Sequence, residues 1–185
     1  MQLKKLLSID LAFADRRAWE HGHPYFPTKE FIKLCGEDDV DIIETLCALV
    51  RRVPDKDSLE AIGEAFTQFD GKRRALEMSG ARVIECPSKP RPSTPGGFKH
   101  SDDQRLMIRT LALAMKLRPD YVLLVAADGD FAPMVEVLRE EGIRTQIIAS
   151  PNNTIAAELR RSAVKIIDLD EMLQRIPVSA SAASS

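Results

Sequence analysis

Short apolar runs and longer amphipathic stretches alternate along the second half of the chain. Between residues 81 and 176, this alternation predicts strands that are each followed by a helix. The predicted strands cover Arg82–Cys86, Tyr121–Ala126, Thr145–Ala149 and Val164–Leu169, and the predicted helices cover Asp102–Leu117, Phe131–Glu141, Thr154–Arg161 and Glu171–Gln174. Alternation of this kind is typical of an α/β fold, in which helices connect the strands of a mostly parallel sheet.

The first part of the chain predicts one strand and a helical region. The strand covers Lys4–Ile9 and ends at Asp10, and its apolar core makes it the natural centre of the sheet. Residues 28–80 show no convincing alternation, so we expect a helical elaboration that covers one flank of the sheet. Its helices would begin at Thr28 and extend over 38–52 and 58–78, with Val50–Val53 as a weak strand candidate.

Two segments have a composition that disfavours regular structure. Residues 87–100 contain prolines and glycines and no acid, which predicts a loop, and the serine- and alanine-rich residues 178–185 predict a disordered tail. A chain of 185 residues is long enough for one domain with its own core. We therefore expect a single domain over residues 1–177.

Composition gives weak guidance on partners and compartment. The formal net charge is -2, so binding to a nucleic acid would depend on a local basic patch. The three cysteines form no C-x-x-C pair, and Asp10 interrupts the apolar run that a signal peptide would continue. No apolar run approaches the length of a membrane span. These features predict a cytoplasmic protein that contacts no membrane.

Carboxylates follow two of the predicted strands. Asp128 and Asp130 come after Tyr121–Ala126, and Asp10 follows the first strand. Because the carboxyl ends of parallel strands meet at one edge of a sheet, we expect these acids to converge. Asp102 and Asp103 begin the helix after the loop and would enter the same edge. Carboxylates without cysteine or histidine suit Mg²⁺ or Mn²⁺ rather than zinc.

Each acid also has a purely structural interpretation. Asp130 at a helix start is typical of an N-cap, and Asp102 and Asp103 are typical of first-turn acids that complement the helix dipole. For either alone, the structural role is the commoner one. An acid at the end of a buried strand, such as Asp10, is costly unless it is paired or bound to a metal. As a group, the acids favour a site where a metal activates water.

Other enzyme classes fit the chain less well. No G-x-G-x-x-G motif follows a strand and no G-x-x-x-x-G-K-[ST] motif is present, which argues against dinucleotide and P-loop enzymes. A phosphotransferase that uses an Asp-x-Asp pair as nucleophile and acid is a further alternative. The segment Phe131-Ala-Pro lacks the threonine that such enzymes commonly place soon afterwards, and we rank this class third.

Several stretches resemble the NYN domain (LabA-like group) of the PIN-like nuclease superfamily. In that family the opening strand ends in an aspartate, as Leu6–Asp10 does, and a Lys-x-x-Asp motif opens a long helix, as in Lys99–Asp103. The family hallmark (S/A)-G-D-x-D-F-x-P-(L/M)-(V/I) is similar to Ala126–Val135, and its closing pieces resemble Leu138–Gly142 and Ala156–Leu159.

This resemblance implies a three-layer α/β/α, Rossmann-like PIN-like fold and a metal-dependent endoribonuclease that hydrolyses RNA with Mg²⁺ or Mn²⁺. The carboxylates it implies for catalysis and metal binding are Asp10, Asp103, Asp128 and Asp130, with Asp102 as the rival of Asp103 for the helix position. The family's D-x-x-L pattern, which Leu106 completes, favours Asp103.

The expected RNA contacts come from the acid-free loop and from a strand end; these residues are Lys89, Arg91, Lys99, His100, Asn153 and Thr154.

Two departures from the family motivate an alternative function. Leu11-Ala-Phe follows Asp10 where the family has a glycine and then an asparagine, and Arg109 replaces a further aspartate. The alternative is a weak or inactive module that binds RNA or a protein partner, and a homodimer is a further candidate assembly.

Overall fold

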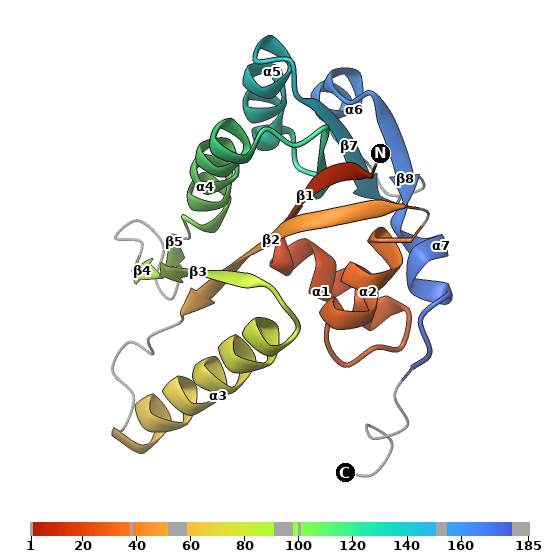
Figure 1. Cartoon of the computed structure of the whole chain (residues 1–185). Coiled ribbons are helices and arrows are strands. Elements are labelled where there is room, and N and C mark those ends of the chain that lie inside the picture. The colour runs from red at the N-terminus through yellow and green to blue at the C-terminus, as the bar shows by residue number, and fades with distance from the viewer. Residues whose placement is uncertain are drawn as a thin grey trace.

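A parallel sheet forms the centre of the molecule (Figure 1). The computed structural model describes residues 2–37, 39–51, 59–90, 98–99, 101–150 and 155–178, and within them six strands pair in the order β3-β2-β1-β6-β7-β8. All of these pairings are parallel. The strands are β1 (Leu3–Ile9), β2 (Val40–Arg51), β3 (Arg82–Pro87), β6 (Tyr121–Val125), β7 (Arg144–Ala149) and β8 (Lys165–Asp168).

Helices cover both faces of this sheet, which confirms the expected α/β/α arrangement. The helices α4 and α5 lie on one face, with α6 beside α5, and α1, α2, α3 and α7 lie on the other (Figure 1). Their bounds are α1 (Leu11–Glu20), α2 (Thr28–Cys35), α3 (Leu59–Met78), α4 (Asp102–Leu117), α5 (Ala132–Glu140), α6 (Ala157–Ser162) and α7 (Leu169–Gln174). Among the residues described, no helix is long and apolar enough to cross a membrane.

The prediction of a helix over residues 38–52 is wrong, because Val40–Arg51 forms strand β2 inside the sheet. Its apolar residues recur at a spacing that one face of a helix would also show, which explains the error. Residues 45–49 are buried in succession, since β2 lies between β1 and β3 and is covered on both faces. This segment is rich in β-branched residues, and that composition favours a strand over a helix. The region 28–80 is therefore only partly helical.

The strand β1 lies in the interior of the sheet, between β2 and β6, as its apolar core predicts. Side chains on both of its faces are fully buried, and so are those of β6 and β7; they include Leu6, Leu7, Ile9, Leu124, Ile147 and Ile148. Each contributes about 1.5–3 kcal/mol by leaving water. Because β1 and β6 are held from both sides, the residues that follow them start from fixed positions.

The segment predicted as a loop contains two very short strands, β4 (Lys89–Pro90) and β5 (Phe98–Lys99), which pair in antiparallel fashion. Residues 91–97 and 100, which complete the predicted loop, lie outside the described residues, as do residues 179–185 of the predicted tail. The division into one domain over 1–177 and a tail therefore stays a prediction.

A buried hydrogen bond joins the central strand to the helix above it. The Ser8 hydroxyl on β1 and the Thr110 hydroxyl on α4 lie 2.8 Å apart, and both residues have no exposed surface. A polar group buried at this depth is tolerated because it has a partner. The bond therefore fixes α4, and with it Asp102 and Asp103, over the end of β1.

We expect Thr110→Val to lower the free energy of unfolding by about 1–3 kcal/mol, since it leaves the Ser8 hydroxyl buried without a partner. The double variant Ser8→Ala/Thr110→Val removes both hydroxyl groups and should recover most of that loss. Urea unfolding followed by circular dichroism measures both values. Equal stability of the wild type and Thr110→Val would show that this bond does not hold α4.

Candidate active site

Two neighbouring strands in the middle of the sheet lead into carboxylates. Asp10 follows β1 directly, and Asp128 follows β6 after two alanines. Ile9 pairs with Val125, and the Asp10 N–H extends this ladder by donating to the Val125 carbonyl oxygen at 3.0 Å. The sheet thus fixes the backbone of Asp10 beside the segment that carries Asp128.

The loop Asp128-Gly129-Asp130 turns at once into a short 3-10 helix, η1 (Gly129–Phe131). Asp128 Oδ1 accepts a hydrogen bond from the Asp130 N–H at 3.1 Å, so Asp128 caps this turn and the expectation that Asp130 is the cap is wrong. A Cβ at Gly129 would lie 3.2 Å from both Ala156 Cβ and Glu158 Oε2. A larger residue here would need Ala156 and Glu158 to shift by a few tenths of an ångström, because the segment entering α6 passes close to the loop.

Asp10 caps a helix as well as ending a strand. Its Oδ1 accepts a hydrogen bond from the Phe13 N–H at 3.2 Å and so begins α1, a helix that the sequence pattern did not predict. Burial raises the pKa of Asp10, the Phe13 hydrogen bond opposes that rise, and the charge of Asp102 adds to it. The carboxylate is thus held in one orientation and partly shielded from water.

The first turn of α4 brings two more acids to the same edge. Burial and the neighbouring carboxylates of Asp10, Asp102, Asp128 and Asp130 raise the pKa of Asp103 to about 7. Burial is the larger cause of this shift, and the like charges of the neighbouring acids add to it. The predicted acids from β1, α4 and the β6 loop are therefore brought together in space, and Asp103 lies where the charges of all the others reach it.

A cavity of about 350 Å³ opens next to Asp10 and Asp128, and Arg16 on α1 lines it with them. The positive charge of Arg16 acts against the rise in the pKa of Asp10. Sequence reasoning missed Arg16 because residues 11–20 were not recognised as a helix. With Asp10 taken as the N-cap, helical geometry would have placed this arginine within two turns of the acids.

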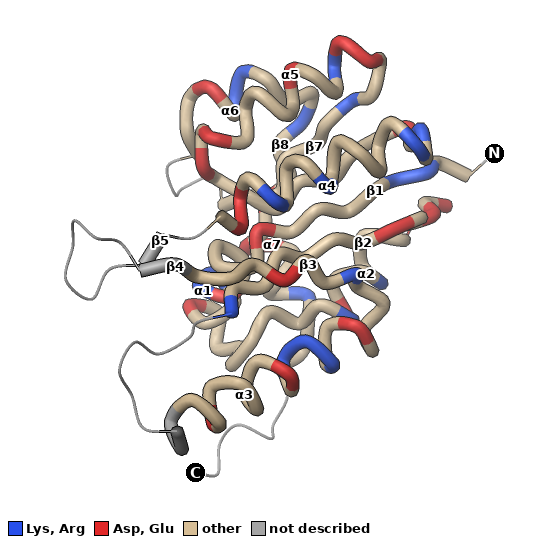
Figure 2. Tube along the Cα trace, turned by 90° about the vertical axis from the view of Figure 1, so that its left-hand side faces the viewer, with Lys and Arg blue, Asp and Glu red and all other residues tan. Residues whose placement is uncertain are grey.

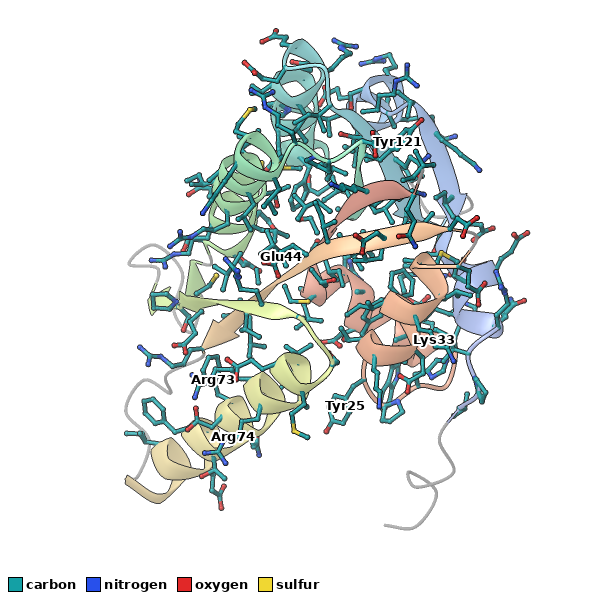
Figure 3. The ribbon with its side chains drawn as sticks, viewed as in Figure 1. Tyr25, Lys33, Glu44, Arg73, Arg74 and Tyr121 are labelled. Carbon is teal, nitrogen blue, oxygen red and sulfur yellow. The ribbon has the colours of Figure 1, made fainter. Side chains whose placement is uncertain are left out.

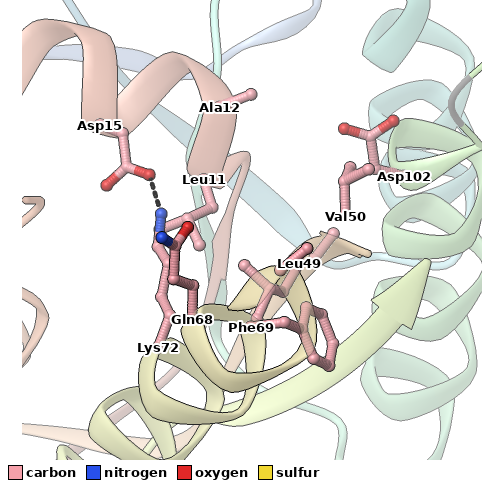
Figure 4. Close-up of a pocket in the computed structure, with 11 residues that line it drawn as sticks. Leu11, Ala12, Asp15, Leu49, Val50, Gln68, Phe69, Lys72 and Asp102 are labelled. Atoms are coloured by element: carbon pink, nitrogen blue, oxygen red, sulfur yellow. Dashed lines mark hydrogen bonds and ion pairs between the residues drawn. The ribbon is translucent and has the colours of Figure 1, made fainter. Parts of the chain in front are cut away.

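A second cavity, also of about 350 Å³, lies on the other side of the acids between α1, β2 and α3 (Figure 4). Asp102 lies at one side of it, and the ion pair between Asp15 of α1 and Lys72 of α3 lies at the other. Apolar residues such as Leu49 and Phe69 supply much of the lining. Asp10 and Asp128 thus line one cavity and Asp102 lines the other, and residues of α1 contribute to both.

The donor set suits a hard divalent cation, because it consists of carboxylates with no sulfur or imidazole among them. In the described part of the chain, no group of three or more Asp, Glu, His or Cys side chains is drawn together closely enough to hold a metal ion. Carboxylates that repel one another without a compensating cation are expected to stand apart. This repulsion adds to burial in raising the pKa of Asp103.

The remaining predicted contacts lie largely beyond what the structure describes. Arg91, His100, Asn153 and Thr154 fall outside the described residues, and only the backbone of Lys89 and Lys99 is described. Lys89 pairs with Lys99 across the β4–β5 ladder, which directly precedes the acidic turn of α4. Their contacts with RNA stay predictions.

Comparisons with known proteins agree with this architecture. The family model of the NYN domain matches residues 38–170. A crystal structure of a protein of unknown function from Vibrio parahaemolyticus aligns with a TM-score of 0.68 at 17% identity, over 92% of this chain and 95% of that one. MurG of Acinetobacter baumannii aligns with a TM-score of 0.47 at 12% identity, over 98% of this chain and 44% of that one. No curated protein matches the chain.

We expect the stability of the metal-free protein to fall as the pH rises from about 4 to about 7, because Asp103 holds its proton up to a pKa of about 7 in the folded state and loses it near 3.8 when unfolded. Asp103→Asn cannot ionise, so its melting temperature should rise relative to wild type across this window and stay higher above it. Thermal melts in a chelating buffer measure the difference.

The matched control for this pH series is Asp41→Asn. Asp41 is an exposed acid near the start of β2, at the opposite edge of the sheet. Its melting temperature should follow the wild type at every pH. Parallel profiles for wild type and Asp103→Asn would show that Asp103 does not titrate in the folded protein near pH 7.

Proposed function

The chain belongs to the NYN domain family, a PIN-like family whose members are generally nucleases, and we propose that it is an endoribonuclease that hydrolyses RNA phosphodiester bonds with Mg²⁺ or Mn²⁺. The observation that supports this proposal is the convergence of Asp10, Asp103, Asp128 and Asp130, whose charges add to burial in raising the pKa of Asp103 to about 7. Groups with perturbed pKa values at the carboxyl edge of an α/β sheet are typical of active sites.

A divalent cation bound by these carboxylates would lower the pKa of a water molecule and polarise the phosphodiester. The protein's own residues prepare the place for it. Asp10 is held by the Phe13 N–H, and Asp128 is held by the Asp130 N–H, so both carboxylates are oriented by the backbone before any ligand arrives. Asp103 carries a proton up to a pH of about 7, which a bound cation would displace.

Arg16 fits the role of a phosphate ligand. It lines the cavity next to Asp10 and Asp128, and its side chain is exposed to the solvent from which RNA would approach. A guanidinium group binds phosphate oxygens with two parallel hydrogen bonds. Arg16 would thereby place a phosphodiester against the acids and balance part of the charge that four carboxylates present to an anionic substrate.

The compartment is part of the same proposal. The cysteines Cys35, Cys47 and Cys86 are all free and buried. Free cysteines are typical of proteins in a reducing environment. We therefore place the activity in the cytoplasm, with RNA as the partner, and retain a homodimer or a protein partner as a further prediction.

A second candidate function is a module that binds RNA or a protein without cleaving. The observation that favours it is the lack, in the described residues, of a closed group of metal ligands. Leu11 and Phe13 are buried in α1, so this segment offers no side chain that replaces the asparagine usual in the family. The two functions predict different effects on RNA cleavage when a carboxylate is replaced.

For the nuclease, Asp128→Asn should lower the rate of RNA cleavage by at least about 100-fold, because even the outer-shell partners of a metal site are worth 10–100-fold. Asp10→Asn should act in the same direction, and excess chelator should abolish cleavage of RNA by the wild type. The control is Asp41→Asn, which removes an exposed carboxylate at the far edge of the sheet. Cleavage of single-stranded and structured RNAs in Mn²⁺ provides the measurement.

Calorimetric titration of Mn²⁺ into the same four proteins separates the two functions. Saturable binding that is lost in Asp10→Asn and Asp128→Asn, together with loss of cleavage, supports one nuclease site. If the wild type neither binds Mn²⁺ nor cleaves RNA, the nuclease proposal is wrong and the binding module replaces it.

Arg16→Gln should lower kcat/KM for RNA cleavage by about 10-fold or more, through a higher KM, a lower kcat or both. This loss corresponds to the 1.5–3 kcal/mol of a hydrogen bond to a charged group. Mn²⁺ affinity should stay within a few-fold of wild type or increase, since a positive charge beside the acids has been removed. Lysine at this position keeps the charge and should restore part of the activity. Unchanged kinetics in Arg16→Gln would exclude contact with the phosphate.

A further inference from the structure

A basic groove lies on the α4 face of the sheet, apart from the acids. It has a volume of about 650 Å³ and runs between α4 and the strands β2 and β3. Four of the residues that line it are cationic: Arg82, Arg105, Arg109 and Lys116. The chain as a whole has a formal net charge of -2, so this gathering of positive charge is local.

The cations on α4 form one straight row. Arg105, Arg109 and Lys116 are separated by four and seven residues, which places them within about 40° of each other around a helix with 3.6 residues per turn. At a rise of 1.5 Å per residue the row extends over about 16 Å. Figure 2 shows basic segments spaced along α4 in this way. The row begins within the first turn after Asp102 and Asp103, so it leads away from the acids along α4.

Within the part of the chain that the structure describes, most of this charge has no ion-pair partner. Among the described residues, Arg105, Arg109 and Lys116 form no ion pair, although Arg105 Nη1 donates a hydrogen bond to the Glu85 carbonyl oxygen at 3.3 Å. Like charges four residues apart on a helix, as in Arg105 and Arg109, destabilise it. A row that folding does not require indicates an anionic ligand.

Two acids next to the groove already form ion pairs, one with Arg73 and one with the groove's own Arg82, so the charge of Arg82 is offset and the cations that attract an anion are those on α4. Arg82 Nη2 lies 2.7 Å from Glu44 Oε2, and Glu85, the acid in the lining, lies 3.3 Å from Arg73 Nη1 of α3. Figure 3 labels Glu44 on β2 and Arg73 on α3. The ion pair with Arg73 offsets the charge of Glu85, so the row on α4 keeps its attraction for an anion.

We propose that this groove binds the phosphate backbone of single-stranded RNA, next to the acids. Side chains that contact phosphates fix the register of a nucleic acid without reading its sequence. No aromatic residue is found among the described residues that line the groove, so stacking of bases does not contribute there. Ile108, which is 64% exposed, offers an apolar contact instead. A cleft between a helix and an edge strand admits a single strand more readily than a duplex.

This inference rests on the proposed nuclease. An RNA strand bound in the groove would have its adjacent phosphates beside the acids at the start of α4. RNA binding in the groove is nevertheless separate from cleavage. It can be measured in chelator, where no metal is available and the RNA stays intact.

The test is the fluorescence anisotropy of a labelled single-stranded RNA of mixed sequence, titrated in chelator over a range of salt concentrations. Each phosphate contact on a single strand adds about 0.7 to the slope of log K against log salt, so Arg109→Gln/Lys116→Gln should lower that slope by about 1.4. At 0.1 M salt this corresponds to about 25-fold weaker binding. The control Arg139→Gln/Lys165→Gln removes the same charge from exposed positions on α5 and β8 and should bind as the wild type does.

The results of these titrations test the groove, its ligand and the nuclease separately. An unchanged slope and affinity in the groove variant, equal losses in the control, or no binding of single-stranded RNA by the wild type would overturn the groove. Tighter binding of duplex RNA or of polyglutamate than of the single strand would overturn the choice of ligand. Loss of RNA binding in the groove variant with no cleavage by the wild type in Mn²⁺ would leave the groove in place and reject the nuclease.

Discussion

Partial burial of several neighbouring carboxylates at the carboxyl edge of the sheet is the constraint that the surrounding structure offsets. Asp103 reaches a pKa of about 7 because it is partly buried among other acids, an arrangement that costs folding free energy. The sheet supplies the compensation. β1 and β6 are buried on both faces, the Asp10 N–H completes their ladder, and the bond between Ser8 and Thr110 ties α4 over them. The acids are therefore held together by parts of the fold that do not depend on a ligand.

A second network holds α1, the helix that Asp10 caps, from its other end. Burial alone would raise the pKa of Asp170, but hydrogen bonds from Arg17, Ser150 and His21 lower it below its usual range. The network joins α1 and the end of β7 to the start of α7, and the pair of Arg17 and Asp170 within it is partly buried. Because α1 is fixed at both ends, Asp10 and Arg16 keep their positions relative to one another.

The sequence predicted the parallel sheet and the acidic edge because both depend on local patterns. Alternating apolar runs identified β3, β6, β7 and β8, and carboxylates that follow buried strands identified Asp10 and Asp128. The strand β2 was missed because its apolar spacing also fits a helix, and only its burial between two neighbours decides between them. Arg16 and the basic groove were missed for a related reason. Their residues come from elements whose proximity depends on tertiary packing, which no local pattern contains.

The helix α4 carries the two kinds of charge on which the proposed nuclease and the proposed RNA groove depend. Asp102 and Asp103 stand at its N-terminus, where the helix dipole favours anions, and Lys116 stands in its last turn, where the dipole favours cations. Arg109 occupies a position where similar proteins often carry an aspartate, yet it lines the groove with Arg82 and Glu85 rather than the cavity at Asp10. This replacement therefore need not weaken the acidic cluster. It adds a cation to the proposed path of a negatively charged strand toward that cluster, where burial and neighbouring acids together raise the pKa of Asp103.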